Sequence, residues 1–439
     1  MRNDVSFQDL ERELERGVLP AWVFSDGRVY EWERERIFKR VWHFLAHESE
    51  IPEAGDYVVR YIVDTPVIVV RTEQGVRAHV NMCRHRGAPV CRGERGRSRV
   101  FRCPYHGWTY SNSGELVGIP FREQIYADPG RIERELSLPL VRVQSYRGLI
   151  FGTLSERAPS LEEYLGESTW YLDLFGCRGL DLEVFGDPER WTLSANWKTA
   201  AENFGVDNLH ILSTHGSLIV ELEQFPFRQE YLLGPTNFVA YFPGRGHAIA
   251  VNRPFPGMKF VGVPEPLIAK MEAEAPEQAP YLDGLSTVVG TIWPNLSLLT
   301  VVQPLGPYPV GQGETPRYWT IRVWQPMGPT QMQVWSWCLV PRGMSEEQKR
   351  KSFQAYRLSF GVSGTFEQDD AEVWKGITEL AASLGGREVR LNYEIDGAEG
   401  PWSGQQLNGA PGVIRPYVTE AGARNFWRTW LSYLRGGEG

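Results

Sequence analysis

Hydrophobic and polar residues change their spacing along the chain, and the change marks out regions of different structure. Helical spacing of apolar residues near the N-terminus predicts a helix over 6–16, and a second helix is predicted through EWERERIFKRVWHFL, residues 31–45. From Asp56 the pattern turns into short runs such as DYVVRYI and PVIVVRT, separated by turn residues. Such runs are typical of β-strands, and they continue to about Phe151.

Beyond about residue 155, strand and helix patterns are mixed. The runs RYWTIRVW and QMQVWSW (317–324 and 331–337) carry apolar residues at alternating positions and predict an antiparallel hairpin. Ser345 and Gln348 then have the spacing of a capping box before a helix that continues through KSFQAYRLSF. The second part of the chain is therefore expected to combine helices with strands.

Composition and charge restrict the function. The chain has 439 residues, of which 42% are hydrophobic and 23% charged, enough for two or three domains. Its formal net charge of −8 disfavours a general nucleic-acid surface. The N-terminus lacks the apolar core of a signal peptide, and no stretch approaches the length of a membrane span, so we expect a cytoplasmic protein without a membrane partner. In that compartment, closely spaced Cys and His residues indicate metal binding or catalysis rather than disulfides.

Two short Cys/His pairs stand out against this background. Cys83 and His85 are separated by one residue, Cys103 and His106 by two, and 17 residues lie between the pairs. Because each pair brings two ligands to one turn, the two loops can close around one metal centre. A Cys2His2 zinc site is one interpretation, although zinc fingers usually place both cysteines first. One Cys and one His on each loop also suits a two-iron cluster with Cys on one iron and His on the other.

A second group lies in NWKTAAENFGVDNLHILSTHG, residues 196–216. Asn203, Asp207 and His210 follow an i, i+4, i+7 spacing, which predicts one face of a helix. His215 would lie about 140° from His210 on a regular helix, so both can bind one ion only if the helix ends between them. Capping and core hydrogen bonds are the alternative roles for these histidines.

If His210 and His215 bind a metal ion, a carboxylate could complete a site of two histidines and one carboxylate, which leaves coordination positions open. The stretch SFGVSGTFEQDD, residues 359–370, leads a glycine-rich apolar segment into two adjacent carboxylates. On a helix Asp369 and Asp370 point about 100° apart, so only one should face a metal. The helix dipole favours acidic residues at such a helix start even without a metal.

These motifs together resemble a known family. C-x-H-x17-C-x2-H followed by Gly-Trp resembles the Rieske 2Fe-2S domain of aromatic ring-hydroxylating oxygenases. D-x2-H-x4-H, from Asp207, resembles the element that binds the family's mononuclear iron, and FG-x2-G-x2-E-x-DD, from Phe360, resembles the element whose second aspartate is a ligand. The C-terminal element RNFWRTWLSYL resembles the corresponding element of the dioxygenase branch of this family. The chain as a whole resembles the catalytic α subunits of naphthalene- and biphenyl-type dioxygenases.

The resemblance implies an α+β protein with two metal centres. It implies an N-terminal helical segment (1–40), a small all-β Rieske domain (41–155) and an α+β catalytic domain with a large antiparallel sheet (156–439). One 2Fe-2S cluster and one mononuclear Fe(II) are the implied cofactors. The implied cluster ligands are Cys83, His85, Cys103 and His106, and the implied iron ligands are His210, His215 and Asp370, with Asp370 preferred to Asp369.

Three further roles follow from the resemblance. Asp207 would be catalytic, bridging His106 of one subunit to His210 of the next. Asn203 would lie near the iron. Phe360 and Phe366 would line the substrate pocket, with ordinary core packing as the alternative.

The implied activity is that of a terminal oxygenase. Electrons from NAD(P)H would arrive through a reductase, a ferredoxin or both, and O2 would hydroxylate an aromatic hydrocarbon or aromatic acid ring, typically to a cis-dihydrodiol. A small β subunit and a homotrimer of α subunits (α3 or α3β3) are the implied assembly partners. Two alternatives remain open: a Rieske monooxygenase that demethylates or hydroxylates a non-aromatic substrate, and a metal-stabilised electron-transfer protein without oxygenase activity.

Overall fold

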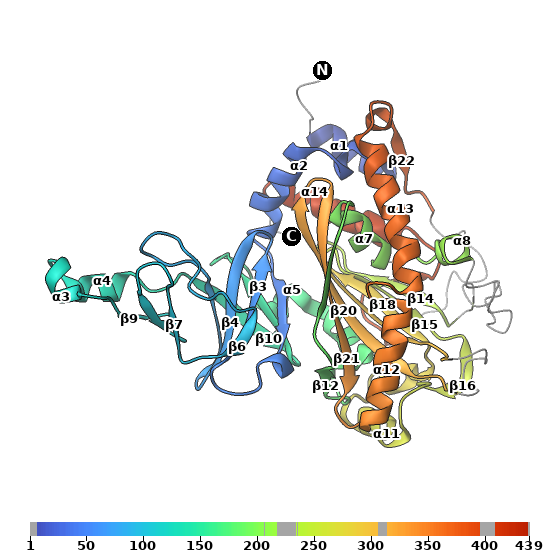
Figure 1. Ribbon diagram of the computed structural model, residues 1–439. Helices are drawn as coiled ribbons and strands as arrows, with labels where there is room; N and C mark the ends of the chain where they lie inside the picture. The colour runs from blue at the N-terminus through green and yellow to red at the C-terminus, as the bar shows by residue number, and fades with distance from the viewer. Residues whose placement is uncertain are drawn as a thin grey trace. The chain divides into compact units, whose positions relative to one another are not determined.

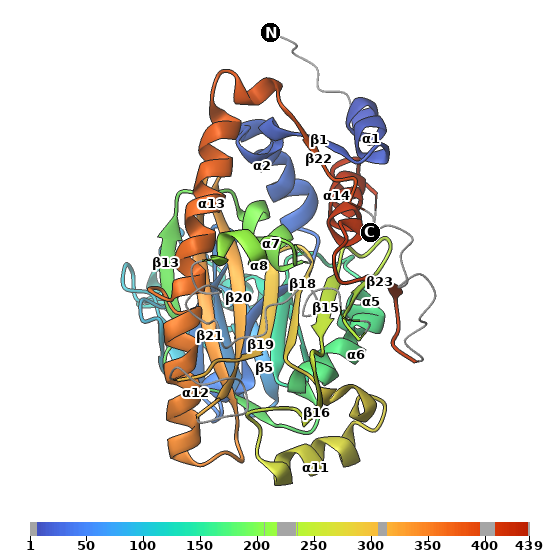
Figure 2. The same cartoon turned by 90° about the vertical axis from the view of Figure 1, so that its right-hand side faces the viewer.

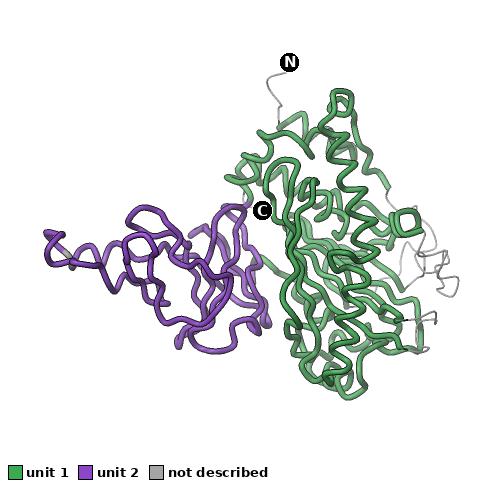
Figure 3. Tube along the Cα trace, viewed as in Figure 1, with its two compact units in different colours: residues 1–37, 164–439 green, residues 38–163 purple. Residues whose placement is uncertain are grey.

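The computed structural model describes residues 7–205, 207–216, 234, 236–305, 314–395 and 409–437. Two compact units contain them (Figure 3). One unit is residues 38–163, and the other joins the described parts of 1–37 and 164–439. Both units contain sheets and helices, so the predicted α+β class is confirmed. Within the described ranges, no helix combines the length and the apolar character that crossing a membrane requires.

The smaller unit is built on a seven-stranded antiparallel sheet in the order β2-β11-β10-β5-β4-β3-β6. The strands predicted from the runs after Asp56 are β3 and β4, and they pair with Val58 opposite Val69. A three-stranded sheet, β7-β8-β9, lies in the same unit. The bounds are β2 His43–His47, β3 Asp56–Ile62, β4 Thr65–Thr72, β5 Gly75–Val80, β6 Arg95–Arg97, β7 Val100–Arg102, β8 Thr109–Ser111, β9 Leu116–Gly118, α3 Arg122–Ile125, α4 Pro129–Glu135, β10 Leu140–Tyr146 and β11 Leu149–Thr153.

The helix predicted over 31–45 is wrong in its second half. Helix α2 (Gly27–Glu33) continues as a π-helical turn that ends at Phe38, and residues His43–His47 form strand β2. All five residues of β2 are buried, and the strand pairs with β11. A fully buried run has no alternation of buried and exposed positions that separates helix from strand, and here the pairing with β11 decides the outcome.

The larger unit contains a nine-stranded antiparallel sheet (Figures 1 and 2). Its order is β12-β21-β20-β19-β18-β15-β14-β23, and β13 also pairs with β21. The predicted hairpin is confirmed as β20 and β21, and the predicted capping box is confirmed at the start of α12. The bounds are β12 Leu182–Val184, β13 Glu189–Leu193, β14 Phe238–Tyr241, β15 Ala248–Asn252, β18 Thr287–Ile292, β19 Leu296–Val302, β20 Arg317–Gly328, β21 Gln331–Pro341, α12 Glu346–Ser359 and β23 Val413–Pro416.

Helices pack on the central part of this sheet. Helix α7 packs on β18, β19 and β20, α12 packs on β20 and β21, and α13 contacts α7, α8 and α12 (Figure 2). The chain passes from the smaller to the larger unit within α5 (Leu161–Leu165). Further α-helices and strands of the larger unit are α1 Phe7–Glu15, β1 Val18–Pro20, α6 Thr169–Leu172, α7 Trp197–Phe204, α8 Ile211–Thr214, β16 Phe255–Lys259, α11 Glu265–Glu274, β17 Asp283–Gly284, α13 Thr365–Ala382, β22 Arg390–Asn392 and α14 Ala421–Leu434.

Strand β20 is buried on both faces, so its alternating pattern does not separate core from solvent. The first ten residues of β20 are all buried, including Thr320 and Arg322. On one face Trp324 packs on Phe204 of α7, and on the other the Trp319 indole N–H donates to the Phe175 carbonyl. The polar positions of this strand are therefore interior positions.

A buried ion pair fixes the N-terminal segment to helix α7. Glu33 and Lys198 are both inaccessible to solvent, and their Oε1 and Nζ atoms are 2.7 Å apart. The indole N–H groups of Trp197 and Trp430 donate to the same carboxylate at 2.9 and 2.8 Å. Residues far apart in the chain thereby meet at one acid. Burial lowers the pKa of Lys198, although the negative charge of Glu33 acts to raise it.

We expect Glu33→Gln to destabilise the protein strongly, because it leaves a buried ammonium without its anion. Loss of one partner of a buried pair costs about 3–5 kcal/mol, which corresponds to a fall of the melting temperature on the order of 10 °C. The double variant Glu33→Gln/Lys198→Met should recover part of that loss. Thermal denaturation followed by circular dichroism measures both, and equal melting temperatures for the single variant and the native protein would contradict the account.

Candidate metal centres

The two predicted Cys/His pairs lie on two similar loops of the smaller unit. The first loop follows β5 and the second joins β7 to β8. In each loop the glycine four residues after the cysteine donates its N–H to the cysteine carbonyl, from Gly87 to Cys83 and from Gly107 to Cys103. Both glycines have positive φ, +77° and +73°, which other residues rarely adopt. The repeated turn brings the two pairs of side chains together.

The four side chains suit a cluster with sulfur inside and imidazole outside. Cys83 and Cys103 are 3% and 2% exposed, whereas His85 and His106 are half-buried with ring centroids 4.4 Å apart. The Arg84 backbone N–H donates to the Tyr110 hydroxyl at 3.0 Å, which leaves that hydroxyl to donate to Cys83 Sγ, 3.4 Å away. Burial raises the pKa of the Cys83 thiol, as expected for thiolates that need a metal for charge compensation. The residues present therefore fit an iron–sulfur group.

Among the described residues of the larger unit, His210, His215 and Asp370 form a group that could hold a metal ion. One potential ligand atom from each lies within 4.8 Å of the others. Asp370 Oδ1 is 3.6 Å from His210 Nε2 and 3.4 Å from His215 Nε2. Asp370 is 2% exposed, and its Oδ1 accepts no hydrogen bond from the described residues. An unpaired buried carboxylate oxygen facing two imidazoles is the arrangement that a divalent cation completes.

Hydrogen bonds to the far side of each imidazole determine which nitrogen faces Asp370. His210 Nδ1 contacts the Asp207 backbone carbonyl oxygen, and His215 Nδ1 lies 3.2 Å from Asp369 Oδ2. Because both acceptors need a proton on Nδ1, both Nε2 atoms keep a lone pair toward Asp370. The two aspartates thus have different positions: Asp370 faces both Nε2 atoms, and Asp369 orients one imidazole from behind.

The backbone around the histidines differs from the single helix face predicted for Asn203, Asp207 and His210. That prediction is wrong, since α7 ends at Phe204 and α8 begins only at Ile211. Asp207 lies between the helices, where its side chain is 49% exposed and its Oδ1 accepts from the His210 backbone N–H at 3.3 Å. Helix α8 ends at Thr214, so the helix ends between the two histidines, as their binding of one ion requires.

Carboxylates dominate the electrostatics of this region. Burial opposes a charge on His210, but the hydrogen bond to Asp207 and the charge of Asp370 raise the pKa of its imidazole. Partial burial alone would raise the pKa of Asp207, and the hydrogen bond with His210 lowers it instead. Burial raises the pKa of Glu202 to about 8, although Tyr393 and Trp427 both donate to its Oε2. Negative charge at the site therefore attracts a cation, whether proton or metal.

A cavity of about 120 Å³ lies beside His210, His215 and Asp370. Phe360 and Phe366 line it, with their rings stacked at a centroid distance of 5.3 Å and an interplanar angle of 15°. Phe366 also packs edge-on against the His215 imidazole, 4.7 Å away. The other lining residues include Asn203, Phe204, Ser286, Thr287, Val289, Leu299, Gln303 and Tyr417. The walls combine flat apolar surfaces with a few polar groups, as small-molecule sites commonly do.

Comparison with known proteins decides the family. The Rieske [2Fe-2S] domain family matches residues 41–146, and the family described as ring hydroxylating alpha subunit (catalytic domain) matches residues 161–436. The chain belongs to the Rieske ring-hydroxylating oxygenase α subunits. The resemblance inferred from the motifs is thereby confirmed, and this α subunit is a Rieske non-haem iron oxygenase whose catalytic domain carries a His-His-Asp group typical of mononuclear iron.

Three similar proteins show where this α subunit lies within the family. It is 36% identical to N,N-dimethyl phenylurea N-demethylase subunit alpha of Sphingobium sp. (strain YBL2), over 97% of this chain and 93% of that one. It is 32% identical to biphenyl 2,3-dioxygenase subunit alpha of Rhodococcus jostii (strain RHA1), over 95% and 89%. Its structure is similar to naphthalene 1,2-dioxygenase from Rhodococcus sp. bound to indole, with a TM-score of 0.91, 38% identity and 99% coverage of both chains.

Three features of the sites were not predicted from the sequence. The hydrogen bond from His215 to Asp369 joins residues 154 positions apart, and spacing gives no signal for it. Tyr110 was not recognised as a partner of Cys83, although it lies two residues after the Gly-Trp of the motif. Arg322 is a buried cation that donates to the Phe360 backbone carbonyl, and the alternating pattern of its strand gave no sign that this position is buried.

We expect Asp370→Asn and Asp369→Asn to separate the roles of the two aspartates. Asp370→Asn should lose the mononuclear iron, because an amide supplies no anionic ligand, and should keep the visible absorption of the cluster. Asp369→Asn should retain iron with an affinity reduced by about 10- to 100-fold, as for other partners of metal-bound histidines. Iron titration of the chelated proteins measures this, and the opposite order of affinities would exchange the two roles.

We expect Tyr110→Phe to lower the reduction potential of the cluster. The lost hydroxyl donates to Cys83 Sγ, and such a bond stabilises the more negative, reduced state. A hydrogen bond of about 1 kcal/mol corresponds to roughly 40 mV for one electron. Protein-film voltammetry of both proteins provides the measurement, and an unchanged or raised potential would show that this hydroxyl does not donate to the sulfur.

Proposed function

We propose that this α subunit is a terminal oxygenase that hydroxylates an aromatic ring to a cis-dihydrodiol with O2 and two electrons from NAD(P)H. The observation that carries the proposal is the unpaired, buried Oδ1 of Asp370, which faces two imidazoles beside a cavity with stacked aromatic walls. An electron carrier without oxygenase activity would have no need of this second centre and its cavity.

The ligand assignments are part of the proposal. Cys83, His85, Cys103 and His106 bind the 2Fe-2S cluster, and His210, His215 and Asp370 bind the mononuclear iron. A ferrous ion in such a 2-His-1-carboxylate site supplies the open coordination positions at which dioxygen is reduced. Support comes from the two Nδ1 contacts, which hold both imidazoles in the tautomer that ligation requires.

The cavity residues orient the substrate. The stacked rings of Phe360 and Phe366 offer a flat apolar wall that suits an aromatic ring and excludes water. Asn203 also lines the cavity and is a polar group available to a bound substrate or water. The reaction is balanced when the arene takes up both atoms of one O2, two electrons and two protons, so that no water is released.

Electron delivery requires partners outside this chain. Membership of the family implies a multicomponent enzyme with a β subunit and electron-transfer proteins. We propose a ferredoxin, a reductase or both as donors and a trimer of α subunits, α3 or α3β3. Asp207 is proposed to link His106 of one subunit to His210 of the next. In support of this, its side chain is half exposed while its backbone carbonyl holds His210.

A second function is favoured by one comparison. The 36% identity to N,N-dimethyl phenylurea N-demethylase subunit alpha is accompanied by polar groups on the cavity wall, including Thr287 and Gln303. Such groups can bind the carbonyl and N–H of a urea. In this case one oxygen atom of O2 would leave with the methyl group as formaldehyde and the other as water. Both functions use the same ligands and differ in the substrate that the cavity accepts.

A single-turnover experiment distinguishes the two functions without the native electron donors. Anaerobically reduced protein is mixed with 18O2 and either naphthalene or N,N-dimethyl-N′-phenylurea, and the products are analysed by mass spectrometry. We expect a naphthalene cis-dihydrodiol that contains two 18O atoms. Formaldehyde from the urea with no dihydrodiol would instead establish the demethylase. No oxygenated product from either substrate, with both metal centres occupied, would overturn both assignments.

A further inference from the structure

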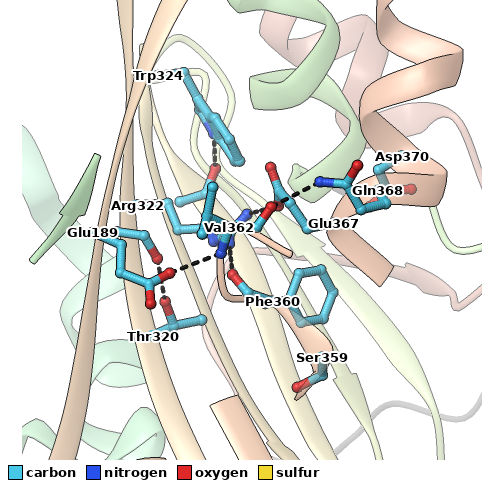
Figure 4. Close-up of polar contacts among 12 residues, drawn as sticks. Glu189, Thr320, Arg322, Trp324, Ser359, Phe360, Val362, Glu367, Gln368 and Asp370 are labelled. Carbon is cyan, nitrogen blue, oxygen red and sulfur yellow. Dashed lines mark hydrogen bonds and ion pairs between the residues drawn. The ribbon is translucent and has the colours of Figure 1, made fainter. Parts of the chain in front are cut away.

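A buried arginine connects the cavity wall with the helix that carries Asp370. Arg322, in the middle of β20, is fully buried. One guanidinium nitrogen donates to Glu367 and the other terminal nitrogen donates to the Phe360 backbone carbonyl, as Figure 4 shows. Glu367 is also fully buried, and it lies on α13 three residues before Asp370. The Arg322 side chain therefore binds both the backbone of Phe360, which lines the cavity, and the side chain of Glu367, which lies one helical turn from Asp370.

Aromatic rings around Arg322 fix the orientation of its guanidinium relative to the groups that it binds. Four aromatic rings lie around it at 5.2–5.6 Å from Cζ to the ring centroids, namely Trp191, Phe204, Trp324 and Phe360. They come from β13, α7, β20 and the segment after α12. A planar guanidinium stacks on aromatic faces and presents its N–H groups in a fixed fork, which a lysine ammonium cannot reproduce.

Further hydrogen bonds hold the turn between α12 and α13, where Phe360 lies. The Val362 backbone N–H donates to Glu189 Oε2 at 2.7 Å, and the Gln368 side chain donates to the Val362 carbonyl at 2.7 Å. Figure 4 shows these contacts beside the Arg322 fork. The turn is thus attached to β13 through Glu189, to β20 through Arg322 and to α13 through Gln368. A displacement of Phe360 cannot leave the start of α13 unaffected.

We propose that Arg322 is a positioning residue that couples occupancy of the aromatic wall to the position of Asp370. A substrate that presses on Phe360 shifts the carbonyl bonded to Arg322, and the same guanidinium transmits the shift through Glu367 to α13. The inference rests on the proposed function, since it assumes a substrate in the cavity and iron at His210, His215 and Asp370. It adds a mechanical connection that neither the metal ligands nor the cavity residues provide alone.

The test compares Arg322→Lys with the native protein by EPR of the ferrous–nitrosyl complex, with and without naphthalene. In the native protein, naphthalene should change the nitrosyl spectrum, because the ligand set shifts with the aromatic wall. Arg322→Lys should keep its iron and its nitrosyl signal, but the naphthalene-induced change should be lost. The KM for naphthalene in this variant should rise by about tenfold, as expected for a misplaced cavity wall.

Glu33→Gln is the matched control, because Glu33 is an equally buried acid paired with a buried cation. Its described polar contacts are with Lys198, Trp197 and Trp430, none of which lines the cavity or belongs to α13. It should lower the melting temperature and keep the naphthalene-induced change. If Arg322→Lys does not fold, Glu367→Gln replaces it, since this variant keeps the Phe360 contact and weakens only the connection to α13.

The outcomes separate coupling from simple stability. A full naphthalene-induced change in a folded Arg322→Lys or Glu367→Gln variant would overturn the proposal. Equal loss in Glu33→Gln would overturn it too, by showing that any loosening of the core has this effect. If neither Arg322→Lys nor Glu367→Gln folds, Arg322 has a structural role alone, and the proposal is overturned. Absence of a nitrosyl signal in the native protein would instead refute the iron site itself, and with it the proposed function.

Discussion

The larger unit is organised around one constraint: a buried carboxylate must be kept ready for a cation that two imidazoles share. Asp370 is almost fully buried, and its Oδ1 has no hydrogen-bond partner among the described residues. Removing an ionised carboxylate from water is unfavourable unless a positive charge lies beside it. The positions of α8 and α13 follow from this requirement, since His210 and His215 at the two ends of α8 must meet Asp370 of α13, which is 155 or more residues away in sequence.

Among the described residues, two other carboxylates that are inaccessible to solvent have a cation as partner. Glu33 is paired with Lys198, and Glu367 with Arg322, and all four side chains are inaccessible to solvent. Each pair joins distant segments, the N-terminal helices to α7 in one case and β20 to α13 in the other. Asp370 differs from both acids because its described neighbours are two imidazoles rather than an arginine or a lysine, which leaves it for a metal.

Local spacing was enough to predict which Cys and His side chains the structure brings together. A Cys and a His on one tight turn are encoded within a few residues, as for Cys83 and His85. Helix phase also separates Asp369 from Asp370. Three features were not predicted: the end of α7 before Asp207, which Gly205 marks as the C-cap, the strand at 43–47, and the burial of Arg322 against Phe204 of α7 and Glu367 of α13. For the strand and for Arg322, contacts with distant segments overrode the local pattern.

The most direct test of the account is a count of iron and acid-labile sulfide in anaerobically purified protein, combined with EPR after dithionite reduction. Two centres predict about three irons and two sulfides per chain, with a Rieske-type signal from the reduced cluster. Two irons and two sulfides that do not increase on reconstitution with iron(II) would contradict the central claim that the His210, His215 and Asp370 group is an iron site.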